Sequence, residues 1–596
     1  MPRSSLWVSL GTATKRGKPI MEGESIDTRS SQPRSFKLSR IATLCFAFLF
    51  LMLWFGALDE RELFHPDEGR YAEIPHEMVA SGDWVTPRLN GFKYFEKPVL
   101  QYWITAASYL ALGEEEFVAR LWPALAGFLT VFLVYLLGRR LAGVRAGVAA
   151  AAVLATTFQF FVFSQIVTLD MGLSFFLALA LYGFLATQDA RTSLRQRRIN
   201  AILMWAAMAL AVLSKGLVGI VLPALVLMVY TVLHRDWKCL GRLHWGIGIP
   251  VFLAISLPWF IWVQVRNPEF FQFFFIHEHF GRFALGEHHR PGKWYYFIAM
   301  LLVGSLPWSL LYVKALFTAW RTPAPSTFTI NPIRLLVVWV VTITVFYSLS
   351  RSKLPGYILP VYPALALLLG CSIRGEGIPL SRRLLGGIAA LGLVAVAAAP
   401  LITRIPKIAN EADLFAPYIY WAMAGGAILV VTAVMSWLSP HHRIAAPTLF
   451  FGLLLAFQVW VTGTESIEDQ FSGETLVENA LDRIGDFDPD VPFYSVDMYD
   501  QTAPHHLNRT LILVNFRGEL AMGIALEPAK AIPNIETFRR LWRDARQAYA
   551  IMPRERFYEE QAAGTPVSLL AANRNVAIVA RTPPNDNAKR PRRPDQ

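Results

Sequence analysis

The feature that most constrains this chain is a series of apolar runs, each about as long as a bilayer is thick. A membrane-spanning helix needs roughly 20 predominantly apolar residues. Thirteen such windows are present, centred on 41–58, 117–138, 146–163, 171–187, 200–214, 217–233, 246–265, 294–318, 333–350, 358–373, 385–402, 417–438 and 446–462. With 54% hydrophobic and 17% charged residues, the chain holds more apolar sequence than one soluble core can bury. We therefore predict an α-helical polytopic membrane protein with about 13 transmembrane helices.

The basic residues predict how these helices are oriented. Arginine-rich segments precede the first window and recur at 138–145, 189–200, 234–242 and 374–383. All of them fall on one side in the thirteen-helix count, which the positive-inside rule assigns to the cytoplasm. The net charge of +12 is therefore attributed to topology, and no nucleic-acid partner is expected. The external side receives the loops 59–98 and 266–293, the turn 351–357 and the sequence after about residue 462.

The two ends of the chain differ in composition from its apolar part. Residues 1–40 are polar and predict a disordered cytoplasmic leader, and residues 41–462 form the predicted transmembrane domain. Beyond it, the strand-like runs "VPFYSVD", "TLILVNF" and "VAIVAR" and the amphipathic helical pattern "IETFRRLWRDARQAYAIM" predict a soluble α/β domain over 463–581. Residues 582–596 are predicted to be a disordered tail. The three cysteines show no C-x-x-C spacing, which makes a disulfide framework improbable.

The first external loop, 59–98, has an unusual density of acids, bases and aromatic residues. It contains "HPDEGRYAEIPHEMVASGDWVTPRLNGFKYFEKP". A solvated, salt-bridged amphipathic helix would explain the charges, but it explains the interleaved Tyr71, Trp84, Tyr94 and Phe95 poorly, since such residues favour the level of the lipid headgroups. A site that faces both lipid and a polar substrate fits the loop better.

Three further features of the sequence are candidates for a functional role. Asp170 interrupts an apolar sequence, and because a charge at membrane depth costs about a few kcal/mol, it should line a cavity or pair with a cation; a helix N-cap is the alternative. The histidines of "HEHFGRFALGEHHR" match no closed four-ligand metal motif. Lys215 lies in the turn of a tight helix pair and suits a structural role as well as a functional one.

Four separated patches resemble one enzyme family. The loop quoted above, "SQIVTLDMGLSFF", "FFFIHEHFGRF" and "SRSKLPGYILPVYPALAL" are similar to those of the bacterial lipid-linked aminoarabinose transferases. This family transfers 4-amino-4-deoxy-L-arabinose to lipid A and is a branch of the polyprenyl-phosphate-dependent GT-C glycosyltransferases, which include protein O-mannosyltransferases. The resemblance implies a GT-C fold, an undecaprenyl-phosphate-linked sugar donor, the lipid A phosphate as acceptor, and an active site on the periplasmic face of the bacterial inner membrane.

The resemblance also implies roles for individual residues. Two essential acids are implied at Asp67 and Asp170. Substrate-binding roles are implied for Arg70, Tyr71, Tyr94, Lys97, Arg282 and Tyr357. A divalent metal ion such as zinc is implied at Glu96 and His277. Elementary chemistry agrees in part, because a departing phosphate dianion needs fixed cations such as Lys97 and Arg282, although either residue could instead be an anchor in the headgroup layer.

Alternatives remain open at this point. The chain could transfer a hexose or another sugar from a polyprenyl-phosphate donor to another glycolipid or to protein. A transporter of lipid-linked sugar is a different class, since intramembrane charges also mark translocation paths, but no inverted repeat is visible. The role of Asp67 depends on the acceptor: a hydroxyl needs a general base, a phosphate needs none, and an aminosugar could pair with the carboxylate.

Overall fold

The computed structural model describes residues 40–281, 292–323, 325–373, 380–405 and 412–581. The chain divides into two compact units, 1–49 and 50–596, and the packing described below is that of the second. The predicted disordered leader, apart from Arg40, and the predicted disordered tail lie outside the described residues.

Long apolar helices dominate the described part of the chain. Nine of them are long and apolar enough to cross a membrane. They are α4 (Glu116–Ala142), α7 (Leu169–Gln188), α8 (Leu194–Lys215), α11 (Trp245–Arg266), α15 (Pro332–Leu349), η2 with α16 (Pro355–Val361, Tyr362–Ser372), α17 with η3 (Arg382–Ala398, Ala399–Arg404), α18 (Ala412–Leu438) and α19 with η5 (His442–Thr462, Gly463–Gln470).

The other four predicted windows contain shorter or bent helices. The pair α5 (Val144–Ala155) and α6 (Phe158–Ser164) is bent by 68°, and the pair α13 (Tyr296–Gly304) and α14 (Ser309–Trp320) by 112°. Two shorter apolar helices are α1 (Arg40–Phe55) and α9 (Val218–His234). Every predicted window thus contains helix, and the helical membrane fold is confirmed, while the number of crossings stays a prediction.

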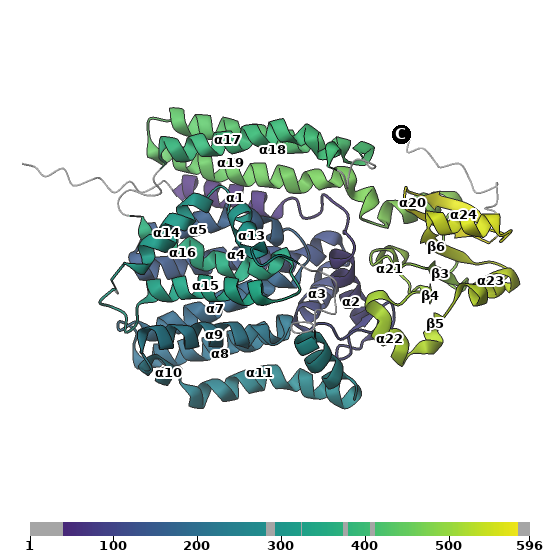
Figure 1. The fold of residues 1–596 in the computed structure, drawn as a ribbon, viewed down its shortest axis with the longest axis horizontal. Coiled ribbons are helices and arrows are strands. Elements are labelled where there is room, and N and C mark those ends of the chain that lie inside the picture. The colour runs from purple at the N-terminus through teal and green to yellow at the C-terminus, as the bar shows by residue number, and fades with distance from the viewer. Residues whose placement is uncertain (1–39, 282–291, 324, 374–379, 406–411, 582–596) are drawn as a thin grey trace, which may run out of the picture. The chain divides into compact units, whose positions relative to one another are not determined.

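The helices differ in how much of their surface the protein covers. In α7, 83% of the apolar window is buried, whereas the figure is 22% in α11 and in α17 with η3. Helix α7 packs against α4 and α8, and α18 packs along α17 and α19 (Figure 1). A helix enclosed on all sides can place a polar group inside the bundle, while the apolar side chains that α11 and α18 leave exposed suit contact with lipid.

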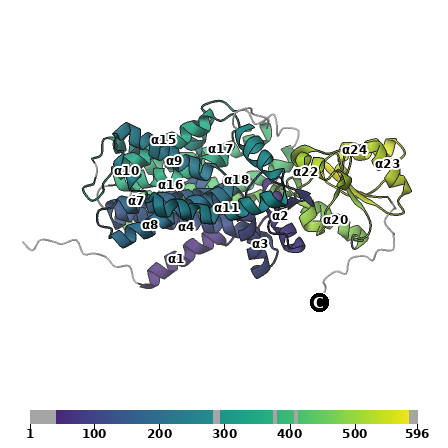
Figure 2. The same cartoon turned by 90° about the horizontal axis from the view of Figure 1, so that it is seen from below.

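The first external loop folds against the soluble part of the chain. It forms α2 (Asp67–Ser81) and the hairpin of β1 (Arg88–Leu89) and β2 (Phe92–Lys93), and α3 (Leu100–Leu112) follows it. Figures 1 and 2 show α2 between the bundle and the C-terminal domain. Most of α2 is buried, and a Cβ added at Gly69 would lie 2.8 Å from the backbone of Gln501. The alternative of a solvated amphipathic helix is therefore not supported, because most of α2 is covered by protein.

The C-terminal domain is a mixed α/β structure, as predicted. Its six-stranded sheet has the order β5-β4-β3-β6-β8-β7, in which β5, β4, β3 and β6 are parallel and β8 is antiparallel to both of its neighbours, β6 and β7. The strands are β3 (Phe493–Val496), β4 (Ile512–Val514), β5 (Ala531–Ile532), β6 (Tyr549–Pro553), β7 (Ser568–Ala572) and β8 (Val576–Ala580). The helices are α20 (Glu474–Ile484), α21 (Ala503–Leu507), α22 (Ala521–Leu526), α23 (Ile535–Asp544) and α24 (Arg554–Ala562).

One prediction about this domain was wrong. The pattern of 535–552 was assigned wholly to helix, but α23 ends at Asp544 and "YAIMP" forms the central strand β6. The end of the pattern is apolar at consecutive positions, and a short run of this kind fits a buried strand as well as a helix. Here pairing with β3 and β8 on both sides decides in favour of the strand.

Candidate active site

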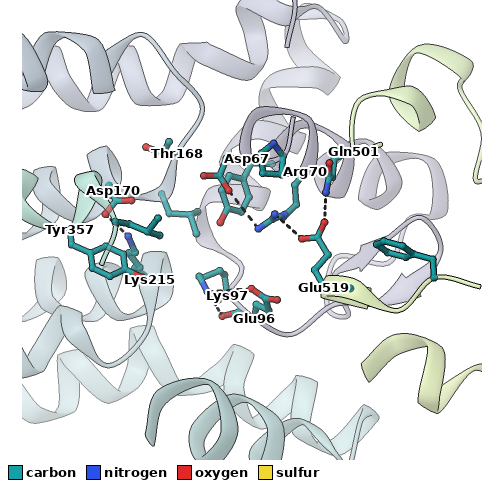
Figure 3. Close-up of a pocket in the computed structure, with 16 residues that line it drawn as sticks. Asp67, Arg70, Glu96, Lys97, Thr168, Asp170, Lys215, Tyr357, Gln501 and Glu519 are labelled. Atoms are coloured by element: carbon teal, nitrogen blue, oxygen red, sulfur yellow. Dashed lines mark hydrogen bonds and ion pairs between the residues drawn. The ribbon is translucent and has the colours of Figure 1, made fainter. Parts of the chain in front are cut away.

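A cavity of about 370 Å³ lies where the first external loop, the bundle and the C-terminal domain meet. Figure 3 shows side chains from all three parts directed toward it. Its lining includes six residues predicted from the sequence, Asp67, Arg70, Tyr71, Lys97, Asp170 and Tyr357, together with the predicted metal ligand Glu96. Lys215, Gln501 and Glu519 also line it. Residues more than 400 positions apart in the sequence therefore share one polar chamber.

Arg70 links the acid of the first loop to the C-terminal domain. Its Nη2 lies 2.7 Å from Oε2 of Glu519, and its Nη1 lies 3.6 Å from Oδ1 of Asp67. Gln501 Nε2 donates to Oε1 of Glu519 at 2.5 Å. Burial raises the pKa of the Glu519 carboxyl, while Arg70 and Gln501 oppose this shift. Glu519 was not among the residues predicted from the sequence, because its segment shows no recognisable catalytic or binding motif.

Two predicted tyrosines surround this ion pair. Tyr71 lines the cavity, whereas Tyr94 lies behind the lining and is 2% exposed. Burial raises the pKa of both phenols well above the ordinary value, so both stay neutral. The Tyr94 hydroxyl is buried without a hydrogen-bond partner. A neutral phenol of this kind can donate to a bound polar group if the cavity wall opens toward it.

Asp170 and Lys215 form an ion pair on the bundle side of the cavity. The Lys215 ammonium contacts Oδ1 of Asp170 and lies 4.7 Å from the centre of the Tyr357 ring. The N-cap alternative for Asp170 is not supported, since the N-cap of α7 is Thr168 and Asp170 is the second helical residue. Gly356 allows the close approach, because a Cβ there would lie 2.7 Å from the Asp170 carboxyl carbon. A lysine that seemed equally structural or functional is thus part of the site.

Lys97 lies at the junction of two cavities. Besides the main one, it lines a smaller cavity of about 120 Å³, and both cavities share Glu96, Lys97, Lys215 and Tyr357. The smaller cavity has apolar walls from Val218, Phe346 and Tyr347. An amphiphile with an anionic head and an apolar chain could place its head at the two lysines and its chain in the smaller cavity.

The predicted metal ligands lie in the same neighbourhood. Lys97 Nζ is 3.8 Å from Oε2 of Glu96 and 3.9 Å from Oε2 of Glu278, and His277 Nδ1 is 3.5 Å from Oε1 of Glu278. The side chain of His277 is 47% exposed and stacks on Phe273. Carboxylates and an imidazole are ligand types that suit zinc, but among the described residues the ligand atoms of Glu96, His277 and Glu278 do not all lie within 4.8 Å of one another. Glu278 is a further acid that the sequence did not single out.

One predicted residue cannot be placed. Arg282, the second predicted phosphate clamp, lies outside the described residues, as do His288 and His289. The helix η1 (Gln272–Gly281), which carries His277 and Glu278, is the last described element before it.

Comparisons with known proteins agree with this geometry. The model of the aminoarabinose transferase C-terminal domain matches residues 483–581, and that of the dolichyl-phosphate-mannose-protein mannosyltransferases matches residues 39–274. The undecaprenyl phosphate-α-4-amino-4-deoxy-L-arabinose arabinosyl transferase of Pseudomonas aeruginosa is 33% identical over 84% of this chain and 90% of its own length. A protein of the same name from Edwardsiella ictaluri is 32% identical over 58% of this chain and 64% of its own length.

A solved structure matches almost the whole chain. The crystal structure of ArnT from Cupriavidus metallidurans bound to undecaprenyl phosphate superposes with a TM-score of 0.86 at 35% identity, covering 93% of this chain and 100% of the other. The apo form of the same protein gives 0.83. The similarity thus extends over the bundle and the C-terminal domain together.

Proposed function

This chain belongs to the aminoarabinose transferase family of membrane glycosyltransferases, and we propose that it transfers 4-amino-4-deoxy-L-arabinose from undecaprenyl phosphate to a phosphate of lipid A. The observation that carries the proposal is the shared cavity, in which two lysines lie at the mouth of an apolar pocket and carboxylates line the other side. In a lipid-phosphate-linked aminosugar, the phosphate would contact the lysines, the lipid chain the apolar pocket, and the sugar ammonium the carboxylates.

The carrier phosphate is assigned to Lys97 and Lys215. As the sugar leaves, a phosphate dianion develops, and cations fixed in advance stabilise that charge without reorganisation. The pairing with Asp170 holds the Lys215 ammonium in place, and the Tyr357 ring below it adds a second fixed contact. The apolar walls of the smaller cavity would receive the first part of the polyprenyl chain.

The aminosugar is assigned to the opposite side of the cavity. Its ammonium is attracted by Asp67 and Glu519, and Arg70 between them fixes the orientation of both carboxylates. Since the acceptor phosphate is already anionic, Asp67 is not required as a general base. It acts by orienting the sugar and by stabilising the positive charge that develops on the sugar ring as the bond to phosphate breaks.

A divalent ion is part of the proposal. Glu96 and His277 would hold it, with Glu278 beside them, and when bound it would add positive charge near the carrier phosphate. Lys97 keeps its role in either case, because its ammonium lies between the two carboxylates.

The proposed place of the reaction is the periplasmic face of the bacterial inner membrane. The support is the charge asymmetry, which puts the loops that build the cavity opposite the arginine-rich segments. Reporter fusions at Gly91 and after Gly473 are expected to give a periplasmic signal, and a fusion at Arg195 a cytoplasmic one. A cytoplasmic signal at Gly91 would overturn this orientation.

The activity is tested by following label into lipid A. Purified protein is incubated with lipid A and undecaprenyl phosphate bearing radiolabelled aminoarabinose, and the products are separated by thin-layer chromatography. Labelled lipid A should form with the native chain and not with Asp67→Asn. If label reaches a hexose acceptor or a protein but not lipid A, the acceptor proposed here is wrong.

A further inference from the structure

A second group of chelating side chains lies outside the cavity, where the bundle joins the C-terminal domain. Glu116 begins α4, Glu474 begins α20, and His506 lies on α21. One potential ligand atom of each lies within 4.8 Å of the other two. Three elements that are far apart in the sequence therefore direct two carboxylates and an imidazole at one point.

The polar atoms of this group are not saturated by the protein. Oε2 of Glu474 and Nε2 of His506 lie 3.7 Å apart, and neither buried atom has a hydrogen-bond partner among the residues that the structure describes. Oε2 of Glu62, in the loop after α1, is buried and unpartnered as well. Buried polar atoms are almost always hydrogen-bonded, so several orphans in one place call for a ligand. The side chains of Glu116, Glu474 and His506 are 18%, 27% and 13% exposed.

The charges at this junction are unbalanced. The nearest guanidinium, Arg120, reaches Glu116 at 3.4 Å, but it is already bound by both oxygens of Glu68 at 3.1 and 3.2 Å and by three backbone carbonyls. The guanidinium that reaches Glu116 is therefore already paired with Glu68, and the carboxylates of Glu116 and Glu474 keep capacity for a further cation.

His506 can supply the third ligand atom. Its Nε2 lies 3.7 Å from Oε2 of Glu474, and a neutral imidazole offers one ring nitrogen with a free lone pair. Carboxylate oxygen and imidazole nitrogen are both ligands of zinc, and three protein ligands with a fourth position for water make a common zinc geometry. Small rotations of the side chains would bring the three atoms to bonding distance.

We propose that Glu116, Glu474 and His506 bind a divalent zinc ion that ties the C-terminal domain to the helical bundle. This site is separate from Glu96 and His277 and touches no substrate. Its ligands lie next to the segment that supplies Gln501 to the cavity: the N–H of Gly473 donates to Oγ1 of Thr502 at 2.7 Å, and Gln501 in turn holds Glu519. The ion would therefore fix the wall of the active site from behind.

The test measures metal binding by the full-length protein. Protein in detergent is stripped with EDTA and titrated with Zn²⁺, and both the bound zinc per chain and the thermal midpoint are recorded for the native chain, Glu474→Gln and His506→Asn. Asp482→Asn, two turns further along α20 and exposed, is the matched acid control. His244→Asn is the histidine control, because His244 has a positive φ of 51° that asparagine tolerates.

The native chain and both controls should bind one zinc ion more than Glu474→Gln and His506→Asn, and zinc should raise the midpoint only in the proteins that bind this ion. The same difference of one ion is expected in a Glu96→Gln background, which removes the predicted site in the cavity. Equal zinc content in all variants would overturn the proposal. So would a stripped native chain whose thermal midpoint does not change when zinc is added.

Discussion

Asp67 and Glu68 are neighbours in one helix, yet they lie in opposite environments. The side chain of Glu68 is 5% exposed and accepts hydrogen bonds from Arg61, Arg120 and the backbone N–H of Val167. The side chain of Asp67 is 45% exposed, faces the cavity and has Arg70 at 3.6 Å. A rotation of about 100° around the axis of α2 thus separates a carboxylate whose oxygens are bound by the protein from one that remains available to a ligand.

The comparison shows that neighbouring acids of one charge-rich loop can have different roles: one stabilises the fold, and the other faces the cavity. Burial raises the pKa of Glu68, but Arg120 and Arg61 outweigh it and lower the pKa to about 2. This carboxylate therefore stays ionised and holds three chain segments together: the loop after α1, the start of α4 and the segment before α7. Asp67 binds none of these segments firmly, so its removal should cost function and not stability.

The largest effect on stability is expected for Glu68→Gln. The substitution leaves Arg61 and Arg120 buried with their main counter-charge removed, and breaking one partner of a buried ion pair costs about 3–5 kcal/mol. Folded yield and thermal midpoint, measured by size-exclusion chromatography after heating, should both fall sharply. Glu60→Gln, in the exposed part of the same loop, is the control. A midpoint equal to that of the control would show that the network adds little.

The second effect is on catalysis. Asp67→Asn keeps the shape of the side chain, so the thermal midpoint should match the native protein while transfer to lipid A falls by roughly 100-fold or more, on the order seen when a charge-stabilising group is removed. Affinity for undecaprenyl phosphate without sugar should not change, since an acid contributes nothing favourable to binding an anion. Turnover at the native rate would remove Asp67 from the reaction.

A smaller effect is expected for the cations of the cavity. Lys97→Ala and Lys215→Ala should each weaken binding of undecaprenyl phosphate in nanodiscs about ten- to a hundredfold, which corresponds to a charge-assisted contact of about 1.5–3 kcal/mol. Lys93→Ala is the matched control, because Lys93 belongs to the same loop but pairs with Glu269 at 2.6 Å and does not line the cavity. If all three variants bind alike, the phosphate site lies elsewhere.

The sequence predicted the class of fold and most of the cavity, but not the contacts made by the C-terminal domain. Apolar length and charge asymmetry identify membrane helices because a bilayer imposes one rule on every crossing. Asp67, Lys97, Asp170 and Tyr357 were found because they stand in motifs. Glu519 and Gln501 were not, since only the folded domain brings them to Arg70. The sequence of the loop also could not show that Glu68 is a structural acid and Asp67 a cavity acid. That difference arises because Arg120, 52 positions after Glu68, binds the Glu68 carboxylate.

The smallest effect concerns pH and sharpens the comparison within α2. Burial raises the pKa of Glu77 to about 7 in the folded protein, whereas an unfolded glutamate titrates near pH 4.3. Between these values the folded state holds more protons than the unfolded state, so stability should be full at about pH 4 and fall as the pH rises to 7, then level off. Glu68, with its pKa of about 2, stays ionised in this range when the protein is folded, and its contribution to stability is lost only at lower pH.

Thermal midpoints of the native chain and of Glu77→Gln, recorded from pH 5 to 8, should therefore diverge by about a few degrees, and the midpoint of the native chain should fall more as the pH rises. The side chain of Glu77 accepts from the N–H of Gly91 at 2.9 Å, a contact that glutamine can keep through its carbonyl oxygen. Parallel curves would mean that Glu77 is as fully ionised as Glu68, and that the two ends of α2 share one electrostatic design.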